Sequence, residues 1–180
     1  MTSILERLGL KQSETAADNP EDKLGVIAGR LEGLEPKRAR LVAAFATVLV
    51  RPARSDLHVS EEESARMVEI VRSFGELAES DARLVVELAT ELGTRQGGTQ
   101  DYLATRELKD LCGPEERKRL LRCFFAVCAA DDSISVLEEE EVRQMATELG
   151  FEHAEYTRAR AAFRDQREVL RQLPGGGHQR

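Results

Sequence analysis

The stretch Asp56–Glu63 reads DLHVSEEE, and the stretch Asp131–Glu138 reads DDSISVLE. Both follow one pattern: Asp, any two residues, a β-branched aliphatic residue, Ser, any two residues and Glu. The two aspartates differ by 75 positions (56 and 131), and the same offset pairs Gly75 with Gly150. The sequence therefore predicts a duplicated unit of helix, acidic turn and helix. Apolar residues are paired by this offset as well: Phe45 with Leu120, Leu49 with Phe124, Ala53 with Cys128, Met67 with Val142, Ile70 with Met145, and Phe74 with Leu149.

The composition favours packed helices over a sheet. The chain has 180 residues, of which 41% are hydrophobic but only 4% aromatic, and it contains no Trp. Apolar residues recur at helical spacing, and no segment alternates apolar and polar residues as a strand would. We therefore predict an all-α fold of about seven to eight helices, arranged in two pseudo-symmetric helix–acidic turn–helix halves.

Proline, glycine and capping residues divide the chain. We expect an N-terminal arm over residues 1–19, a single helical domain over 20–173 and a tail over 174–180. The two halves are predicted at about 36–93 and 114–173. Helix starts are expected at Pro20, Pro36, Ser60, Ser80, Asp101, Pro114 and Ser135, and helix ends at Gly75 and Gly150.

The charge balance excludes some classes of function. The formal net charge is −7, which argues against a dedicated nucleic-acid binder. The Arg-rich stretches at 37–40 and 117–122 lie beside acids and are interpreted as solvated helix faces. No apolar run approaches the length of about 20 residues that spans a bilayer, and the N-terminus does not resemble a secretory signal. The three cysteines lack metal-site spacing and are interpreted as reduced thiols. We expect a soluble, cytoplasmic protein.

Half of the acidic motif is explained by helix capping. In Ser60-x-x-Glu63 and Ser135-x-x-Glu138, the Ser side chain accepts from one backbone N–H and the Glu side chain from another. Each cap contributes about 1 kcal/mol. The Ser and Glu residues therefore have a sufficient structural explanation, although their oxygens remain available as ligands.

The aspartates of the motif are harder to explain structurally. Asp56 and Asp131 directly follow predicted helices, where the carbonyl ends carry partial negative charge and disfavour an acid. Either each Asp side chain accepts from nearby backbone N–H groups, or it helps to bind a cation. Asp132 makes the second turn the stronger candidate. Oxygen ligands favour Ca²⁺, Mg²⁺ or Mn²⁺. The candidate metal ligands are Asp131, Asp132, Ser135, Glu138, Asp56, Ser60 and Glu63. The turns are not EF-hands, because Val136 and Val142 occupy the Gly and Glu positions of that loop.

The paired turns, each followed by an apolar helix ending in Gly, resemble those of the TerB (tellurite-resistance B) family over about residues 36–173. The segment from Leu121 to Glu141 carries the strongest resemblance. It implies an all-α TerB-like bundle, acidic turns as suspected metal-binding positions, and an association with tellurite resistance and stress response. The family usually has Gly after the Asp, whereas this chain has Leu57 and Asp132. Leu57 and Pro52 therefore weaken the first turn.

Three function classes remain open at this point. The leading prediction is a non-enzymatic TerB-like module that binds a divalent cation or a protein partner through its acidic turns. The alternative is a helical scaffold or adaptor in which the turns only cap helices. A metal-dependent hydrolase is disfavoured because the three histidines are dispersed and no nucleophile–base pair or phosphate-binding loop is visible.

Overall fold

The computed structural model describes residues 23–51, 61–93, 100–129 and 136–172, and these residues form eight helices and no strand. The predicted all-α fold is therefore confirmed. None of these helices is long and apolar enough to cross a membrane. The helices are α2 (Lys23–Glu32), α3 (Pro36–Leu49), α4 (Glu61–Gly75), α5 (Glu79–Gly93), α6 (Gln100–Leu111), α7 (Pro114–Cys128), α8 (Val136–Glu148) and α9 (His153–Gln172).

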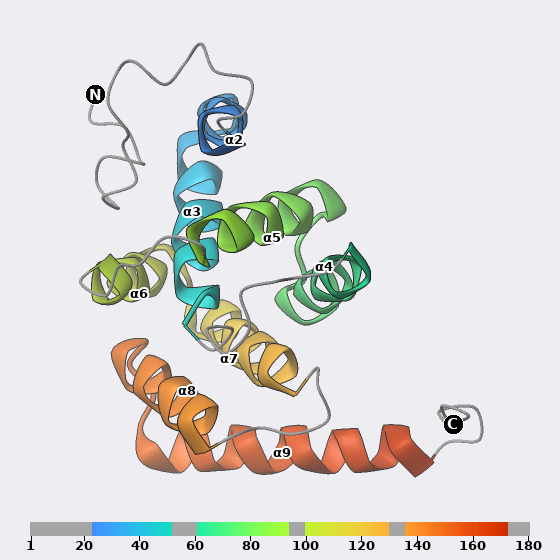
Figure 1. Cartoon of the computed structure of the whole chain (residues 1–180). Coiled ribbons are helices and arrows are strands. Elements are labelled where there is room, and N and C mark those ends of the chain that lie inside the picture. The colour runs from blue at the N-terminus through green and yellow to red at the C-terminus, as the bar shows by residue number, and fades with distance from the viewer. Residues whose placement is uncertain (1–22, 52–60, 94–99, 130–135, 173–180) are drawn as a thin grey trace.

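Two helices, α3 and α7, form the centre of the bundle. Every residue of α3 from Val42 to Leu49 is buried, and α7 is buried from Cys123 to Cys128. Helix α3 packs against α2, α5 and α6, whereas α7 packs against α4, α8 and α9 (Figure 1). The two centres meet where the rings of Phe45 and Phe124 lie edge to face, with centroids 5.8 Å apart. One continuous core therefore joins both predicted halves.

Helix starts follow the local signals in the sequence. Pro36 is the first residue of α3, and the Glu35 carboxylate before it accepts from the backbone N–H groups of Lys37 (3.1 Å) and Arg38 (3.0 Å). Pro114 likewise begins α7, and the Glu116 carboxylate accepts from the Gly113 N–H at 2.7 Å. Proline at the first helical position loses no hydrogen bond, because an N–H there would have no partner within the helix. Pro36 and Pro114 therefore mark helix starts.

The two predicted glycine helix ends are not equivalent. After α8, Gly150 has φ +89°, its N–H donates to the Thr147 carbonyl, and the Phe151 N–H donates to the Ala146 carbonyl at 2.9 Å. This is a Schellman motif, in which a left-handed residue closes the helix. After α4, the left-handed residue is instead Glu76 (φ 53°), and Gly75 belongs to the helix. Helix α4 thus ends at Gly75, as predicted, but the left-handed residue that follows it is Glu76 and not a glycine.

The Arg-rich stretches are not simply solvated faces, which corrects that part of the sequence interpretation. Arg38 makes two hydrogen bonds to buried Asp81, from Nε at 2.6 Å and from Nη2 at 2.7 Å. Arg40 pairs with Glu107 on α6. Arg117 donates from Nη1 to the Leu149 carbonyl at 2.7 Å, which places a cation at the negative end of α8. These arginines connect helices.

Two pairs of helix starts keep or nearly keep the spacing of the sequence pattern, whereas α3 and α7 begin at residues 36 and 114, a difference of 78. Helix α4 begins at residue 61 and α8 at residue 136, a difference of 75; α5 begins at 79 and α9 at 153, a difference of 74. Contacts nevertheless cross between the halves, because α4 packs against α7 of the second half. The halves are therefore interleaved.

Candidate functional site

The predicted acidic turns fall mainly outside the described residues. Asp56, Ser60, Asp131, Asp132 and Ser135 belong to the segments 52–60 and 130–135, for which no structure is given. The assignment of these residues as metal ligands therefore stays a prediction. The helices that follow the two segments are described, and they locate the remaining two candidates.

Glu63 and Glu138 occupy the same position in their helices. Helix α4 begins at Glu61 and α8 at Val136, so Glu63 and Glu138 are each the third helical residue. This is the position from which a Glu side chain closes a capping box. Glu63 is exposed to solvent, together with Glu61 and Glu62. The first turn of α4 therefore presents carboxylates on the surface, next in sequence to the first motif Ser.

The acids that follow Glu138 are paired with arginines. Glu139 pairs with Arg160 of α9 at 2.6 Å, and Glu140 pairs with Arg143 one turn further along α8. Glu141 accepts from Arg51 at 3.2 Å. The charge of the acidic run of α8 is therefore compensated by Arg160 of α9, by Arg51 and by Arg143 of α8 itself.

Arg51 is the centre of a buried ion-pair network that connects the two predicted halves. Its side chain is 5% exposed, and it follows α3, directly before the first acidic segment. Nη1 donates to Glu148 Oε2 at 2.7 Å and lies 3.4 Å from the Thr105 hydroxyl, while Nε donates to Glu141. We name Arg51, Thr105, Glu141 and Glu148 the Arg51 network. It joins the end of α3 to α6 and α8.

The Arg51 network keeps Glu148 ionised. Burial acts to raise the pKa of Glu148, but hydrogen bonds from Arg51 and Thr105 and the Arg51 charge outweigh burial and bring the pKa below its ordinary value of 4.5. The side chain of Glu148 is 12% exposed, whereas that of Glu141 is 43% exposed. Glu148 is thus the partner whose charge depends on Arg51.

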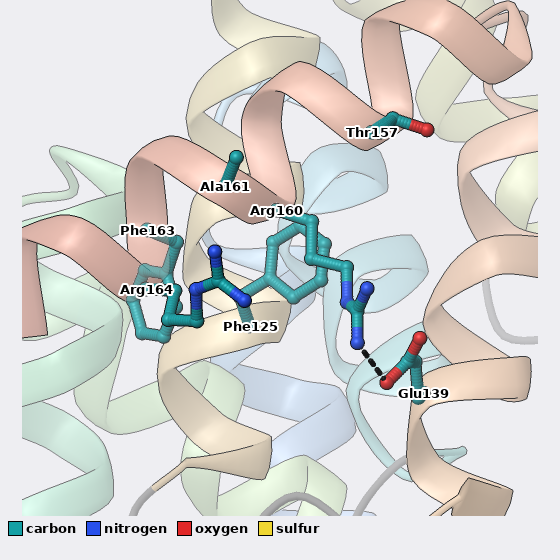
Figure 2. Close-up of a pocket in the computed structure, with 7 residues that line it drawn as sticks. All are labelled: Phe125, Glu139, Thr157, Arg160, Ala161, Phe163 and Arg164. Atoms are coloured by element: carbon teal, nitrogen blue, oxygen red, sulfur yellow. Dashed lines mark hydrogen bonds and ion pairs between the residues drawn. The ribbon is translucent and has the colours of Figure 1, made fainter.

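A groove of about 350 Å³ lies between α7, α8 and α9. We name it the α9 groove. Figure 2 shows Arg160 and Arg164 projecting from α9 toward it, with the Phe125 ring between them in this view. Its full lining consists of Phe125, Glu139, Thr157, Arg160, Ala161, Phe163 and Arg164.

The α9 groove combines a rigid apolar floor with a polar wall. Phe125 and Phe163 are buried and stack with centroids 5.8 Å apart and an interplanar angle of 20°. Phe125 also contacts Tyr156, at a centroid distance of 5.7 Å. The α9 residues of the wall are exposed, and the Arg160 side chain is held by its ion pair with Glu139. Because the two Phe rings at its base are buried, the surface of the groove is formed mainly by the exposed α9 side chains.

The buried thiols do not form a reactive site. Cys112, Cys123 and Cys128 are all buried and form no disulfide, as expected for reduced cysteines. Burial is the main cause that raises the pKa of Cys112 to about 11, and burial also raises the pKa of Cys123. Across the described ranges, no three His, Cys, Asp or Glu side chains gather closely enough to hold a metal ion. This finding does not bear on the acidic segments outside those ranges.

The sequence did not single out the Arg51 network or the α9 groove. A signal for the groove exists: Thr157 and Ala161 are small residues four positions apart, and Arg160 and Arg164 flank them at helical spacing. Arg51 has no comparable signal, because its partners are 54, 90 and 97 positions away.

The structure defines an all-α module in which α4 and α8, the helices that begin within the two acidic motifs, both pack on one central helix, α7. A family model described as "Tellurite resistance protein TerB" matches residues 42–161, and the chain therefore belongs to the TerB family. The match covers the end of α3, both acidic segments and α9 as far as Ala161. No curated protein sequence and no solved structure shows significant similarity to the chain.

Proposed function

We propose that this TerB-family module is a non-catalytic component of a tellurite- or stress-resistance system and binds a divalent cation through its acidic turns. The observation that carries the proposal is the placement of the two motifs. Each motif Ser directly precedes a helix start, and α4 and α8 both pack on α7. The two helices that follow the acidic segments thus share one packing partner.

The chemistry of the motif suits a hard cation. Carboxylate and hydroxyl oxygens are the ligand types that Ca²⁺, Mg²⁺ and Mn²⁺ prefer. Asp131 and Asp132 provide two carboxylates in the second motif, with Ser135 and Glu138 following, whereas the first motif offers Asp56, Ser60 and Glu63. We propose the second motif as the stronger site for this reason.

A non-catalytic role is supported by the character of the described residues. The buried thiols have raised pKa values and are poor nucleophiles at neutral pH. His153, the one histidine of the described ranges, is exposed on the first turn of α9. A bound cation would then act on the conformation of the acidic turns and on partner binding.

The scaffold alternative is favoured by one observation. The third-residue placement of Glu63 and Glu138 is the one a capping box requires, and a capping box would give these two residues a structural role without any metal. Cation binding therefore has to be tested through the aspartates, which the caps do not use.

The test is thermal unfolding and calorimetry of the metal-free chain with Ca²⁺, Mg²⁺, Mn²⁺ or Zn²⁺. A cation present at a hundredfold excess over its dissociation constant should stabilise the fold by about 2.7 kcal/mol. Asp131→Asn should remove most of this gain and Asp56→Asn less of it. The matched control is Glu32→Gln, an exposed acid at the end of α2, which should retain the full gain. If none of the four ions stabilises the chain, the scaffold reading replaces the cation-binding one.

A further inference from the structure

We propose that an exposed face of α6 docks an acidic segment of a partner protein. An apolar side chain of that segment would cover the apolar end of the face, and its carboxylates would meet the cationic end. We name Tyr102, Leu103, Arg106 and Lys109 the α6 face. The proposal does not depend on cation binding at the acidic turns, because it concerns a different surface. Figure 1 shows α6 at one edge of the bundle, beside α3.

The apolar end of the α6 face is open to solvent. Within the described ranges, three large apolar side chains are exposed, and they are Val26, Tyr102 and Leu103. Two of them, Tyr102 (57% exposed) and Leu103 (49% exposed), are neighbours on α6. Single exposed apolar side chains are ordinary, whereas adjacent ones form a patch that a partner can cover. Tyr is also enriched among the residues that dominate the energy of interfaces. The incoming segment should therefore carry a Leu, Ile or Phe side chain at this end.

The cationic end of the face lies in line with Tyr102. Tyr102, Arg106 and Lys109 fall at positions i, i+4 and i+7, which form one stripe along about 10 Å of the helix axis, and all three are exposed. Leu103 lies three positions before Arg106, so the apolar and cationic ends are continuous. A chain segment that lies along α6 would therefore contact both ends.

Helix α7 brings a further cation to the Lys109 end of the face. The Lys109 Nζ atom lies 3.0 Å, and the Arg117 Nη1 atom 3.3 Å, from the point where a Cβ on Gly150 would stand, so these two nitrogens are at most about 6.3 Å apart. The Arg117 guanidinium donates to the Leu149 carbonyl, at the negative end of α8. A helix end carries only about half a unit of charge, so it offsets part of the two positive charges. A carboxylate beside both cations would relieve the repulsion that remains between them.

The described acids near the α6 face are engaged elsewhere. Arg40 of α3 pairs with Glu107, whose hydrogen bond raises the pKa of Arg40, and the charge of Asp110 adds to this effect. The Glu116 carboxylate of α7 accepts from the Gly113 N–H at the start of its own helix. The α6 face is therefore a cationic surface in a chain whose formal net charge is −7. This contrast favours an acidic protein segment over nucleic acid, because the rest of the chain would repel the phosphates of a long polyanion.

The experiment begins with a random peptide library displayed on phage, selected on the full chain in buffer that contains EDTA. Peptides that also bind the variant Leu103→Ser are removed by counter-selection, which selects for use of the apolar end and leaves the charge of the peptides free. We expect the remaining peptides to combine several Asp or Glu residues with an apolar residue. The affinity of the enriched peptides, labelled with fluorescein, is then measured by fluorescence anisotropy.

Two matched pairs of variants make the measurement specific. Leu103→Ser and Lys109→Glu should each weaken peptide binding by about tenfold or more, as expected for loss of a central contact. Val26→Ser and Lys23→Glu make the same kinds of change at exposed positions of α2, and should change the affinity by less than about twofold. Circular dichroism establishes that each variant is folded.

Four outcomes would each overturn the proposal. Equal weakening by Lys23→Glu and Lys109→Glu would show that the attraction depends on the charge of the whole chain. Enriched peptides without an excess of acidic residues, or a failure to enrich any peptide, would show that the face does not select acidic segments. A fluorescein-labelled single-stranded DNA that binds more tightly than the peptides, and loses its affinity in Lys109→Glu, would assign the face to nucleic acid. Sedimentation showing a dimer that Leu103→Ser abolishes and Val26→Ser does not would assign it to a second copy of the chain.

Discussion

Replacing Arg51 with methionine removes the cation of the Arg51 network while keeping most of the aliphatic volume of the side chain. Arg51 is 5% exposed and Glu148 is 12% exposed, so the variant leaves a carboxylate in a nearly dry site without its partner. Removing one member of a buried pair costs about 3–5 kcal/mol. Glu141 is 43% exposed, so water can solvate its carboxylate in the variant. The expected loss of stability therefore lies at the lower end of this range.

We therefore expect the free energy of unfolding of Arg51→Met to fall by about 3 kcal/mol at neutral pH. For a chain of this length, such a change lowers the melting temperature by about 6–12 °C. The assay is urea and thermal unfolding followed by far-ultraviolet circular dichroism. The matched control is Arg83→Met, which removes an exposed pair with Glu79 one helical turn away and should cost less than about 0.5 kcal/mol.

The loss in Arg51→Met should depend on pH. In the wild type the folded pKa of Glu148 is depressed below 4.5, so its stabilising contribution is present above the unfolded pKa and is lost as the pH falls through the folded pKa. Without Arg51, burial raises that pKa, and Glu148 destabilises the variant until it is protonated. The difference between wild type and variant should therefore shrink as the pH falls from about 7 toward 4. A loss below about 1 kcal/mol at neutral pH, or one that does not change with pH, would refute this account.

Two further predictions concern backbone conformation and thiol chemistry. Gly150→Ala should destabilise the chain by about 1–2 kcal/mol in urea unfolding, because φ is +89° and the new Cβ would lie 3.0 Å from Lys109 Cε and Nζ. Gly75→Ala should stay within about 0.5 kcal/mol of the wild type, because Gly75 lies within α4 without positive φ, and equal losses would contradict the Schellman assignment. Cys112, whose pKa burial raises to about 11, should react with iodoacetamide at pH about 8 roughly a hundredfold more slowly in the folded chain than in urea. Mass spectrometry of the digested protein measures this rate, and equal labelling in both conditions would contradict the burial of the thiol.

Much of the fold could be predicted from the sequence because its signals are local. Pro36 and Gly113-Pro114 mark helix starts through the chemistry of proline and of the neighbouring glutamates, whose contacts span at most three residues. The apolar residues Phe45 and Phe124 fall in the core as their helical spacing indicates. Such local signals do not identify a residue that acts through a distant partner.

Contacts between distant helices explain the features that the sequence did not reveal. Asp81 was expected to open a helix together with Ser80, and α5 begins nearby at Glu79; the burial of Asp81 and its double hydrogen bond to Arg38 depend on how α3 crosses α5. Arg51 is buried only because α8 brings Glu148 to it. At the acidic turns the sequence remains the source of the metal hypothesis, since the aspartates lie outside the described residues.

The interleaving of the two halves has a consequence for synthesis of the chain. Helix α4 ends at residue 75, whereas its partner α7 is completed only at residue 128, which is 53 residues later. At about 5–20 residues per second, a ribosome needs roughly 3–10 s to make this stretch. During that interval α4, with its buried Val71 and its partly buried Met67, Ile70 and Phe74, has no α7 to pack against. The core around the first half therefore cannot be completed until α7 of the second half has been synthesised.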